Sequence, residues 1–108
     1  MVPFVALDLS VKVIELLRPV VGIVRREDPD LARQIRRAAS SVAQNLGEGS
    51  ERAGRDRGHH FRIAAGSHRE LMVSLRVAGA WGAVGDLGEI PELLDRLGAI
   101  LFRLTHPR

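Results

Sequence analysis

Residues 37–75 decide the fold, and they read RAASSVAQNLGEGSERAGRDRGHHFRIAAGSHRELMVSL. In and around this stretch, small and apolar residues recur at steps of three and four, the spacing that aligns one face of an α-helix. The first stripe consists of Ile35, Ala38, Ala39, Val42 and Leu46. The second stripe consists of Phe61, Ala64, His68, Leu71, Leu75 and Ala78. The stretch therefore predicts two helices whose stripes face each other.

The two stripes are joined by a polar segment that carries several glycines, residues 49–58. Such a composition is typical of an exposed turn, and helices joined by a short connection pack as antiparallel neighbours. With the turn centred near Ala53, residues whose numbers sum to about 106 lie opposite each other. The expected pairs are Ile35 with Leu71, Arg36 with Glu70, Ala38 with His68, and Val42 with Ala64.

Two further amphipathic patterns flank this pair. The first predicts a helix from near Asp8 to Arg26, with the apolar stripe Val11, Ile14, Leu17, Val21 and Val24. The second predicts a helix that Pro91 opens, with the apolar face Leu93, Leu94, Leu97, Ile100, Leu101 and Leu104. No alternating strand pattern or internal repeat is present. We therefore expect one all-α domain over residues 1–108, an antiparallel up-down-up-down four-helix bundle.

Helix boundaries in the central pair are predicted from their capping residues. Asp28 followed by Pro29 is a start signal for the second helix, because the carboxylate can accept from free amides and proline presets the first helical dihedral. Gly49 is expected to end that helix in the left-handed conformation. Asp56 is the expected cap of the third helix, which should run to about Trp81.

Asn45 falls on the apolar side of the second helix, three residues after Val42. Because a buried amide without partners is costly, we expect it to be satisfied internally, by the turn or by the third helix near Phe61. We weigh this structural role above a ligand-binding one. Glu48 and Arg52 have the spacing of a local ion pair, and we interpret that pair as structural too.

The third helix carries more apolar surface than one packing seam requires. The residues outside its main stripe are Ile63, Met72, Val73, Val77 and Trp81. A helix that is apolar on several sides is buried on several sides, so this surplus predicts a second partner surface. That surface belongs either to the first and fourth helices or to another subunit, which makes a homo-oligomer the expectation; a dimer is the default by frequency.

The central motif resembles a known family. Residues 36–49 read RRAASSVAQNLGEG, and a basic residue, a phenylalanine, an Ala-Gly-Ser and a Glu-Leu follow in order. This arrangement resembles the four-helix bundle family of 23S rRNA intervening-sequence proteins. The motif residues are Asn45, Glu48, Gly49, Arg52, Phe61, Ser67 and Glu70. Gly47 replaces the alanine usual in that family, and His68 stands where an aliphatic residue is usual, so the third helix is expected to pack somewhat differently here.

The chain is also similar, more distantly, to the accessory variability determinant of diversity-generating retroelements. That similarity implies a pentameric ring of basic bundles that associates with RNA and with a reverse transcriptase. Most members of the nearer family have no assigned activity, so the resemblance specifies the fold better than the function.

Positive charge is concentrated in the central pair of helices. The whole chain has a net charge of +3, whereas residues 31–80 carry nine arginines against four acids. Arginine supplies 15 of the 16 basic residues, and its planar guanidinium suits bidentate contacts with phosphate. An arginine bias can also reflect a GC-rich genome, and composition alone favours neither explanation.

Arg55, Arg62, Arg69 and Arg76 recur every seven residues. Seven residues are nearly two helical turns, so the last three form a stripe on one side of the third helix. Together with Arg36 and Arg37 they are the candidate nucleic-acid-binding residues; the alternative is an ordinary solvent-facing charged row. With three Phe, one Trp and no Tyr in the chain, binding of RNA or DNA should depend on phosphate contacts rather than on base stacking.

Catalytic, metal and cofactor sites are not predicted. The chain has no cysteine, and a metal site in a bundle needs Glu with His three residues later on two helices. His60 and His68 are interpreted as a solvent-edge and a core histidine. Ser67, His68 and Glu70 are triad residue types, but neighbours on one helix point in different directions.

We therefore expect a non-enzymatic protein without a cofactor, located in the cytoplasm. The absence of cysteine suits a reducing compartment, the first residues lack the basic start of a secretory signal, and no membrane span is expected. Two functions remain open. One is an RNA-associated adaptor that uses the arginine-rich surface; the other is an oligomeric protein-interaction scaffold, which the expected proximity of Glu70 to Arg36 favours.

Overall fold

Four α-helices make up most of residues 2–108, the part of the chain that this computed structural model describes, with side chains from residue 5 onward. They are α1 (Val2–Glu27), α2 (Pro29–Ser50), α3 (Gly54–Ala80) and α4 (Ile90–Thr105). No strand occurs within these residues. The predicted all-α class and the number of helices are confirmed.

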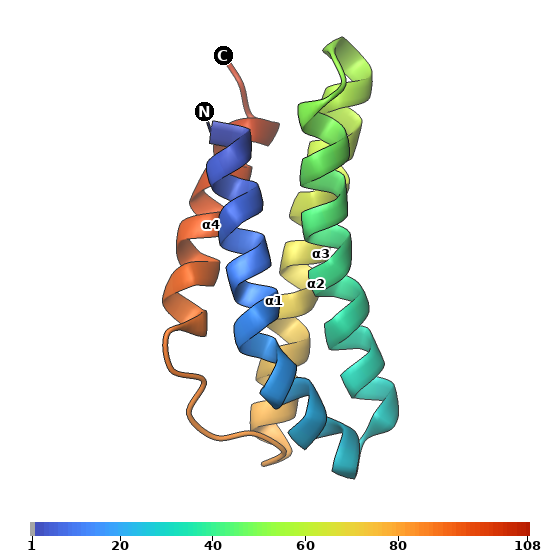
Figure 1. The fold of residues 1–108 in the computed structure, drawn as a ribbon, viewed down its shortest axis with the longest axis vertical. Coiled ribbons are helices and arrows are strands. Elements are labelled where there is room, and N and C mark those ends of the chain that lie inside the picture. The colour runs from blue at the N-terminus through green and yellow to red at the C-terminus, as the bar shows by residue number, and fades with distance from the viewer. Residues whose placement is uncertain (1) are drawn as a thin grey trace.

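The helices pack around a shared core, and each one packs mainly against two others. The contacting pairs are α1 with α2, α2 with α3, α3 with α4, and α1 with α4. In Figure 1 the N and C labels lie at one end of the molecule, and the turn between α2 and α3 lies at that end too. This turn projects beyond the ends of α1 and α4. The end of the α2–α3 pair must therefore be stabilised by its own contacts.

Both predicted stripes of the central pair are buried, as expected. The core consists of two clusters, one on each side of the middle of the bundle. Ile35 and Leu71 belong to the first cluster, whereas Val42 and Ala64 belong to the second, together with Leu46 and residues of α4. The two apolar pairs predicted from the turn thus lie within common parts of the core.

α1 begins earlier than predicted, at Val2 rather than near Asp8. Ala6 is fully buried and belongs to the second core cluster, so packing extends the helix beyond the stripe that the sequence pattern marks. Pro3 lies in the first turn of the helix, where the missing N–H of proline leaves no intrahelical bond unmade.

The start of α2 confirms the predicted cap, but its end does not. The Asp28 carboxylate accepts from the Leu31 amide at 3.0 Å. The expected left-handed conformation at Gly49 is wrong: the positive-φ glycines are Gly54, Gly82 and Gly88. Gly49 is helical and buried, and a Cβ there would lie 2.5 Å from Cε1 of Phe61. The glycine is needed for close approach of α3, not for a turn.

The predicted cap of α3 is also wrong. α3 begins at Gly54, whose φ of +62° favours glycine, and no side chain caps it. Asp56 lies inside the first turn, where a negative charge interacts favourably with the free amides. α3 ends at Ala80, followed by Trp81 as the C-cap, close to the predicted end.

The surplus apolar residues of α3 divide into two groups. Met72 is half-buried and packs against the first core cluster. The others remain exposed, with Val73 at 59% and Trp81 at 80% of their full accessibility. α3 packs against α2 and α4, yet neither these helices nor α1 cover Ile63, Val73, Val77 and Trp81.

Within the described residues, no helix is long and apolar enough to cross a membrane.

Candidate functional site

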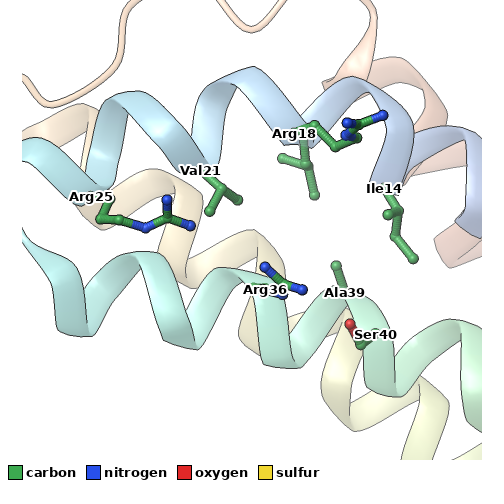
Figure 2. Close-up of a pocket in the computed structure, with 8 residues that line it drawn as sticks. Ile14, Arg18, Val21, Arg25, Arg36, Ala39 and Ser40 are labelled. Atoms are coloured by element: carbon green, nitrogen blue, oxygen red, sulfur yellow. The ribbon is translucent and has the colours of Figure 1, made fainter.

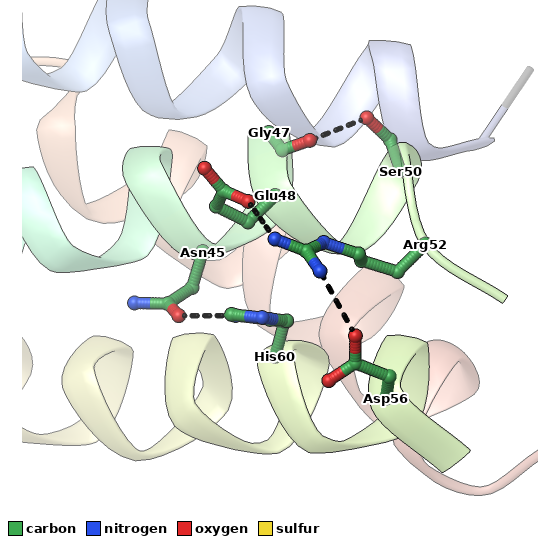
Figure 3. A network of polar contacts seen from close by, with 7 residues as sticks. All are labelled: Asn45, Gly47, Glu48, Ser50, Arg52, Asp56 and His60. Carbon is green, nitrogen blue, oxygen red and sulfur yellow. Dashed lines mark hydrogen bonds and ion pairs between the residues drawn. The ribbon is translucent and has the colours of Figure 1, made fainter. Parts of the chain in front are cut away.

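A chain of hydrogen bonds links α2 to α3 near their shared turn, and Figure 3 shows the one between Asn45 and His60. Asn45 donates through Nδ2 to the Ser41 carbonyl at 2.9 Å and to the Ser41 hydroxyl at 3.2 Å. Its Oδ1 accepts from Nδ1 of His60 at 3.0 Å. The Ser41 hydroxyl also lies 2.7 Å from the hydroxyl of Ser67. Asn45 was predicted to be satisfied by the turn or by the third helix near Phe61, and the second alternative is confirmed, with His60 as the partner in α3.

This chain of contacts explains the polar motif residues in structural terms. Among the described side chains, no buried nitrogen or oxygen lacks a partner. Serine and asparagine bonded across a helix pair fix its register, because a shift by one turn would leave them buried and unpaired. The polar residues at 41, 45, 60 and 67, which we call the α2–α3 seam, therefore position the two helices.

Arg52 forms two ion pairs across the turn, as Figure 3 shows. Its guanidinium contacts Glu48 and Asp56, each at 3.2 Å. The hydrogen bond to Glu48 and the nearby charge of Asp56 raise the pKa of Arg52 above its ordinary value. The predicted Glu48–Arg52 pair is confirmed, and Asp56 joins it. These side chains are about half exposed. The two ion pairs therefore connect the residues of the turn while remaining in contact with solvent.

His68 is a core histidine, as predicted, and it bonds to α4. Its Nε2 donates to the Leu94 carbonyl at 2.8 Å, and the side chain is buried. A Cβ at Gly98 would lie 2.9 Å from the His68 ring. Gly98 therefore makes room for the histidine. His60 lies at the solvent edge, also as predicted.

The six candidate arginines all lie on the surface. Arg36, Arg37, Arg55, Arg62, Arg69 and Arg76 are exposed. Arg62, Arg69 and Arg76 lie along α3 within about 40° of one another, while Arg55 is in its first turn. In the described part of the chain, ion pairs involve only Arg33 and Arg52, so none of the six has an acidic partner within salt-bridge distance.

The expected pairing of Arg36 with Glu70 is wrong. Glu70 shares a surface hollow with Arg37 and Arg69 on the α2–α3 side. Arg36 faces α1 instead and lines a hollow with Arg18 and Arg25. Consecutive residues point about 100° apart on a helix, so Arg36 and Arg37 serve different sides of α2. The six arginines do not form one surface.

The hollow between α1 and α2 was missed by the sequence reasoning (Figure 2). It has a volume of about 450 Å³ and is lined by Ile14, Leu17, Arg18, Val21, Arg25, Arg36, Ala39 and Ser40. A signal was present: Arg18 and Arg25 are seven residues apart, the same spacing as in the arginine stripe of α3, and they lie beside the apolar stripe of their helix.

Residues 2–108 contain no group of three His, Asp or Glu side chains that could hold a metal ion. The fold and these surfaces define a small helical bundle with a structural polar seam and free arginines on several sides. The model of the family described as 23S rRNA-intervening sequence protein matches residues 5–103, so the chain belongs to that family. That description names no enzymatic activity. No curated protein and no solved structure gives a significant match to the chain.

Proposed function

We propose that this chain is a cytoplasmic, non-enzymatic, antiparallel up-down-up-down bundle that assembles with copies of itself and associates with RNA. The observation that carries the proposal is the outer surface of α3. There, Arg62, Arg69 and Arg76 have no acidic partner, and apolar side chains lie exposed on the same helix. The family description mentions 23S rRNA but names no binding partner, so the proposal of RNA as the partner rests on the arginines.

The arginine stripe would contribute phosphate contacts. Guanidinium groups bind phosphate oxygens bidentately, and such contacts position a nucleic acid without reading its sequence. In an oligomer the stripe would be repeated by symmetry, which multiplies a weak site into a large positive field. DNA would be bound by the same contacts, and a reverse transcriptase is the protein partner that the distant family similarity implies.

The exposed apolar residues of α3 support self-association. Ile63, Val73, Val77 and Trp81 occur along one helix without a cover from the same bundle. Contiguous apolar patches of several hundred Å² are uncommon on monomers. A pentameric ring is the assembly that the family resemblance implies, and a dimer is the alternative. Light scattering at micromolar concentration tests this directly: a mass near 11.8 kDa would contradict self-association.

The RNA proposal is tested by the salt dependence of binding. The Arg62→Gln/Arg69→Gln variant should shallow the slope of log affinity against log salt by about 0.7–0.9 for each phosphate group that it no longer binds. The matched control is Arg96→Gln/Arg103→Gln, which removes the same charge from exposed positions of α4. Circular dichroism and light scattering should show that both variants keep their helicity and oligomeric state. Equal slopes in both variants would contradict a role for the stripe.

An interaction scaffold without RNA binding is the second candidate. One hollow of the α2–α3 side carries Arg37 and Arg69 beside Glu70 and the exposed Val73. Mixed charges around apolar residues are typical of protein interfaces, whose rims are polar. Under this proposal, RNA binding is absent at physiological salt, and Val73→Glu disrupts the oligomer while Arg62→Gln/Arg69→Gln leaves it intact.

A further inference from the structure

We propose that the hollow between α1 and α2 binds an organic phosphate of about mononucleotide size. The phosphate would lie between Arg25 and Arg36, and an apolar part of the ligand would lie on Val21 and Ala39. This site is separate from the arginine stripe of α3. It goes beyond the proposed function, because it requires neither RNA nor an oligomer.

The walls of the hollow combine an apolar floor with a positive rim. Leu17, Val21 and Ala39 are buried at its base. Figure 2 shows the guanidinium groups of Arg25 and Arg36 entering the space between the two helices from opposite sides, with Arg18 farther along α1. Ser40 adds a half-buried hydroxyl beside Ala39. The arginines and the Ser40 hydroxyl, which can bind phosphate, thus surround an apolar surface.

The charges of this hollow are not balanced within the bundle. Arg18, Arg25 and Arg36 form no ion pair with the described acids, and no acid lines the hollow. Like charges brought together from two helices repel each other. An anion with two negative charges would remove that repulsion and accept several charge-assisted hydrogen bonds, which are the strong ones.

Other hollows of the same bundle differ in this respect. The one beside Arg37 and Arg69 contains Glu70, and the one beside Arg76 contains Asp95. A third, along the end of α2, contains Glu48 and Glu51 and no arginine. An acid in each of these would repel a phosphate. The α1–α2 hollow, by contrast, has three cations and no acid.

The size and the floor select the class of ligand. A volume of about 450 Å³ falls in the range of roughly 300–1,000 Å³ typical of small-molecule sites. Inorganic phosphate would contact only the charged rim and would leave the apolar floor exposed to water. A phosphate ester with a flat or aliphatic body would cover both parts. A free mononucleotide and the phosphorylated end of an RNA share this chemistry.

The test is calorimetric titration of the full chain with AMP, adenosine and inorganic phosphate. AMP should bind, and adenosine and phosphate should each bind at least about tenfold more weakly, because each makes only part of the contacts. Arg25→Gln/Arg36→Gln should weaken AMP binding at least about tenfold. The matched control Arg62→Gln/Arg69→Gln should not. No AMP binding at millimolar concentration, or equal binding in both variants, would overturn the proposal.

Two further measurements secure the result. Arg25 and Arg36 are exposed, so circular dichroism should show an unchanged helix content; if the double variant loses helicity, Arg36→Gln alone replaces it. A short RNA with a 5′-phosphate is compared with the same RNA carrying a 5′-hydroxyl. A preference for the phosphate that Arg25→Gln/Arg36→Gln removes supports the site with an RNA end as its ligand. AMP binding without that preference supports it with a free nucleotide. Loss of RNA binding only in Arg62→Gln/Arg69→Gln, with no AMP binding, supports the proposed function and overturns this site.

Discussion

α2 forms two interfaces, which differ in whether their polar groups have partners within the protein. On the side of α3, glycine at position 49 allows close packing, and the α2–α3 seam gives each polar side chain a partner. On the side of α1, the helices leave a hollow, and Arg36 faces two further arginines without an acid. The first interface resembles the interior of a protein, in which polar groups are paired. The second combines buried apolar residues with exposed arginines that have no acidic partner among the described ion pairs.

The difference shows how to interpret polar residues in a small bundle. Residues 41, 45, 60 and 67 bond to one another, and none of the buried nitrogens and oxygens among the described side chains lacks a partner. The arginines of the α1–α2 hollow have donors but no protein acceptor among the described ion pairs. A ligand-binding residue is better sought where hydrogen-bond donors have no partner within the protein.

Gly49→Ala should have the largest effect, because it places a methyl group against the tightest contact of the α2–α3 interface. The new Cβ would lie 2.5 Å from the Phe61 ring, and overpacking a core costs about 1–3 kcal/mol or more. Gly47→Ala is the matched control, since a Cβ there meets nothing within 4 Å. It should stabilise the helix by about 0.5–1 kcal/mol. Urea unfolding measures both, and a destabilised Gly47→Ala would contradict this account.

Gly98→Ala should come next, because its methyl group would meet the ring of His68 at 2.9 Å. We expect a loss of about 1–2 kcal/mol after the better helix propensity of alanine is counted. The cost should largely disappear in the His68→Ala background, where the clash is absent. A double-mutant cycle measures this coupling; additive effects would show that the glycine and the histidine are independent.

The sequence predicted the helices from periodicity, and the stripes of α2 and α3 are buried as expected. The prediction from sequence was wrong where close contacts between helices determine the role of a residue. Gly49 was expected to end α2. From sequence alone, a glycine that a turn requires cannot be distinguished from a glycine that makes room for an aromatic ring of a neighbouring helix. The same holds for Gly98, whose role depends on a histidine about thirty positions earlier.

The candidate site was predictable only in part. Asn45 was expected to find a partner in the turn or in α3, because an amide withdrawn from water requires one, and His60 of α3 is that partner. Arg36 and Arg37 were grouped as neighbours in sequence, although their side chains lie in different hollows. The α1–α2 hollow depends on how two helices with separate patterns face each other, and a one-dimensional pattern does not contain that information.

Asn45→Ala should have a smaller effect than the glycine substitutions. It removes the amide that links Ser41 to His60, so Nδ1 of His60 loses its acceptor and the oxygens of Ser41 lose a donor, in partly buried positions. We expect a loss of about 0.5–1.5 kcal/mol, the net contribution of hydrogen bonds between groups that water can partly reach. Asn45→Asp is the comparison, because it keeps the acceptor for His60 but removes the donor to Ser41. Unfolding curves in urea measure both variants, and a neutral Asn45→Ala would mean that the seam does not hold α2 against α3.

Arg36→Gln should have the smallest effect and the opposite sign. Arg36 faces Arg18 and Arg25 across the hollow, and Arg33 lies three residues before it on the same helix, so removing its charge relieves repulsion. At low ionic strength the midpoint of thermal unfolding of Arg36→Gln should rise by about 1–3 °C, and this gain should vanish at about 1 M salt, where charges are screened. Arg37→Gln is the neighbouring control, because Arg37 shares its hollow with Glu70; its midpoint should stay the same or fall. A lower midpoint for Arg36→Gln at low salt would mean that this arginine is held by favourable contacts, and the two sides of α2 would then not differ in the way that their hollows suggest.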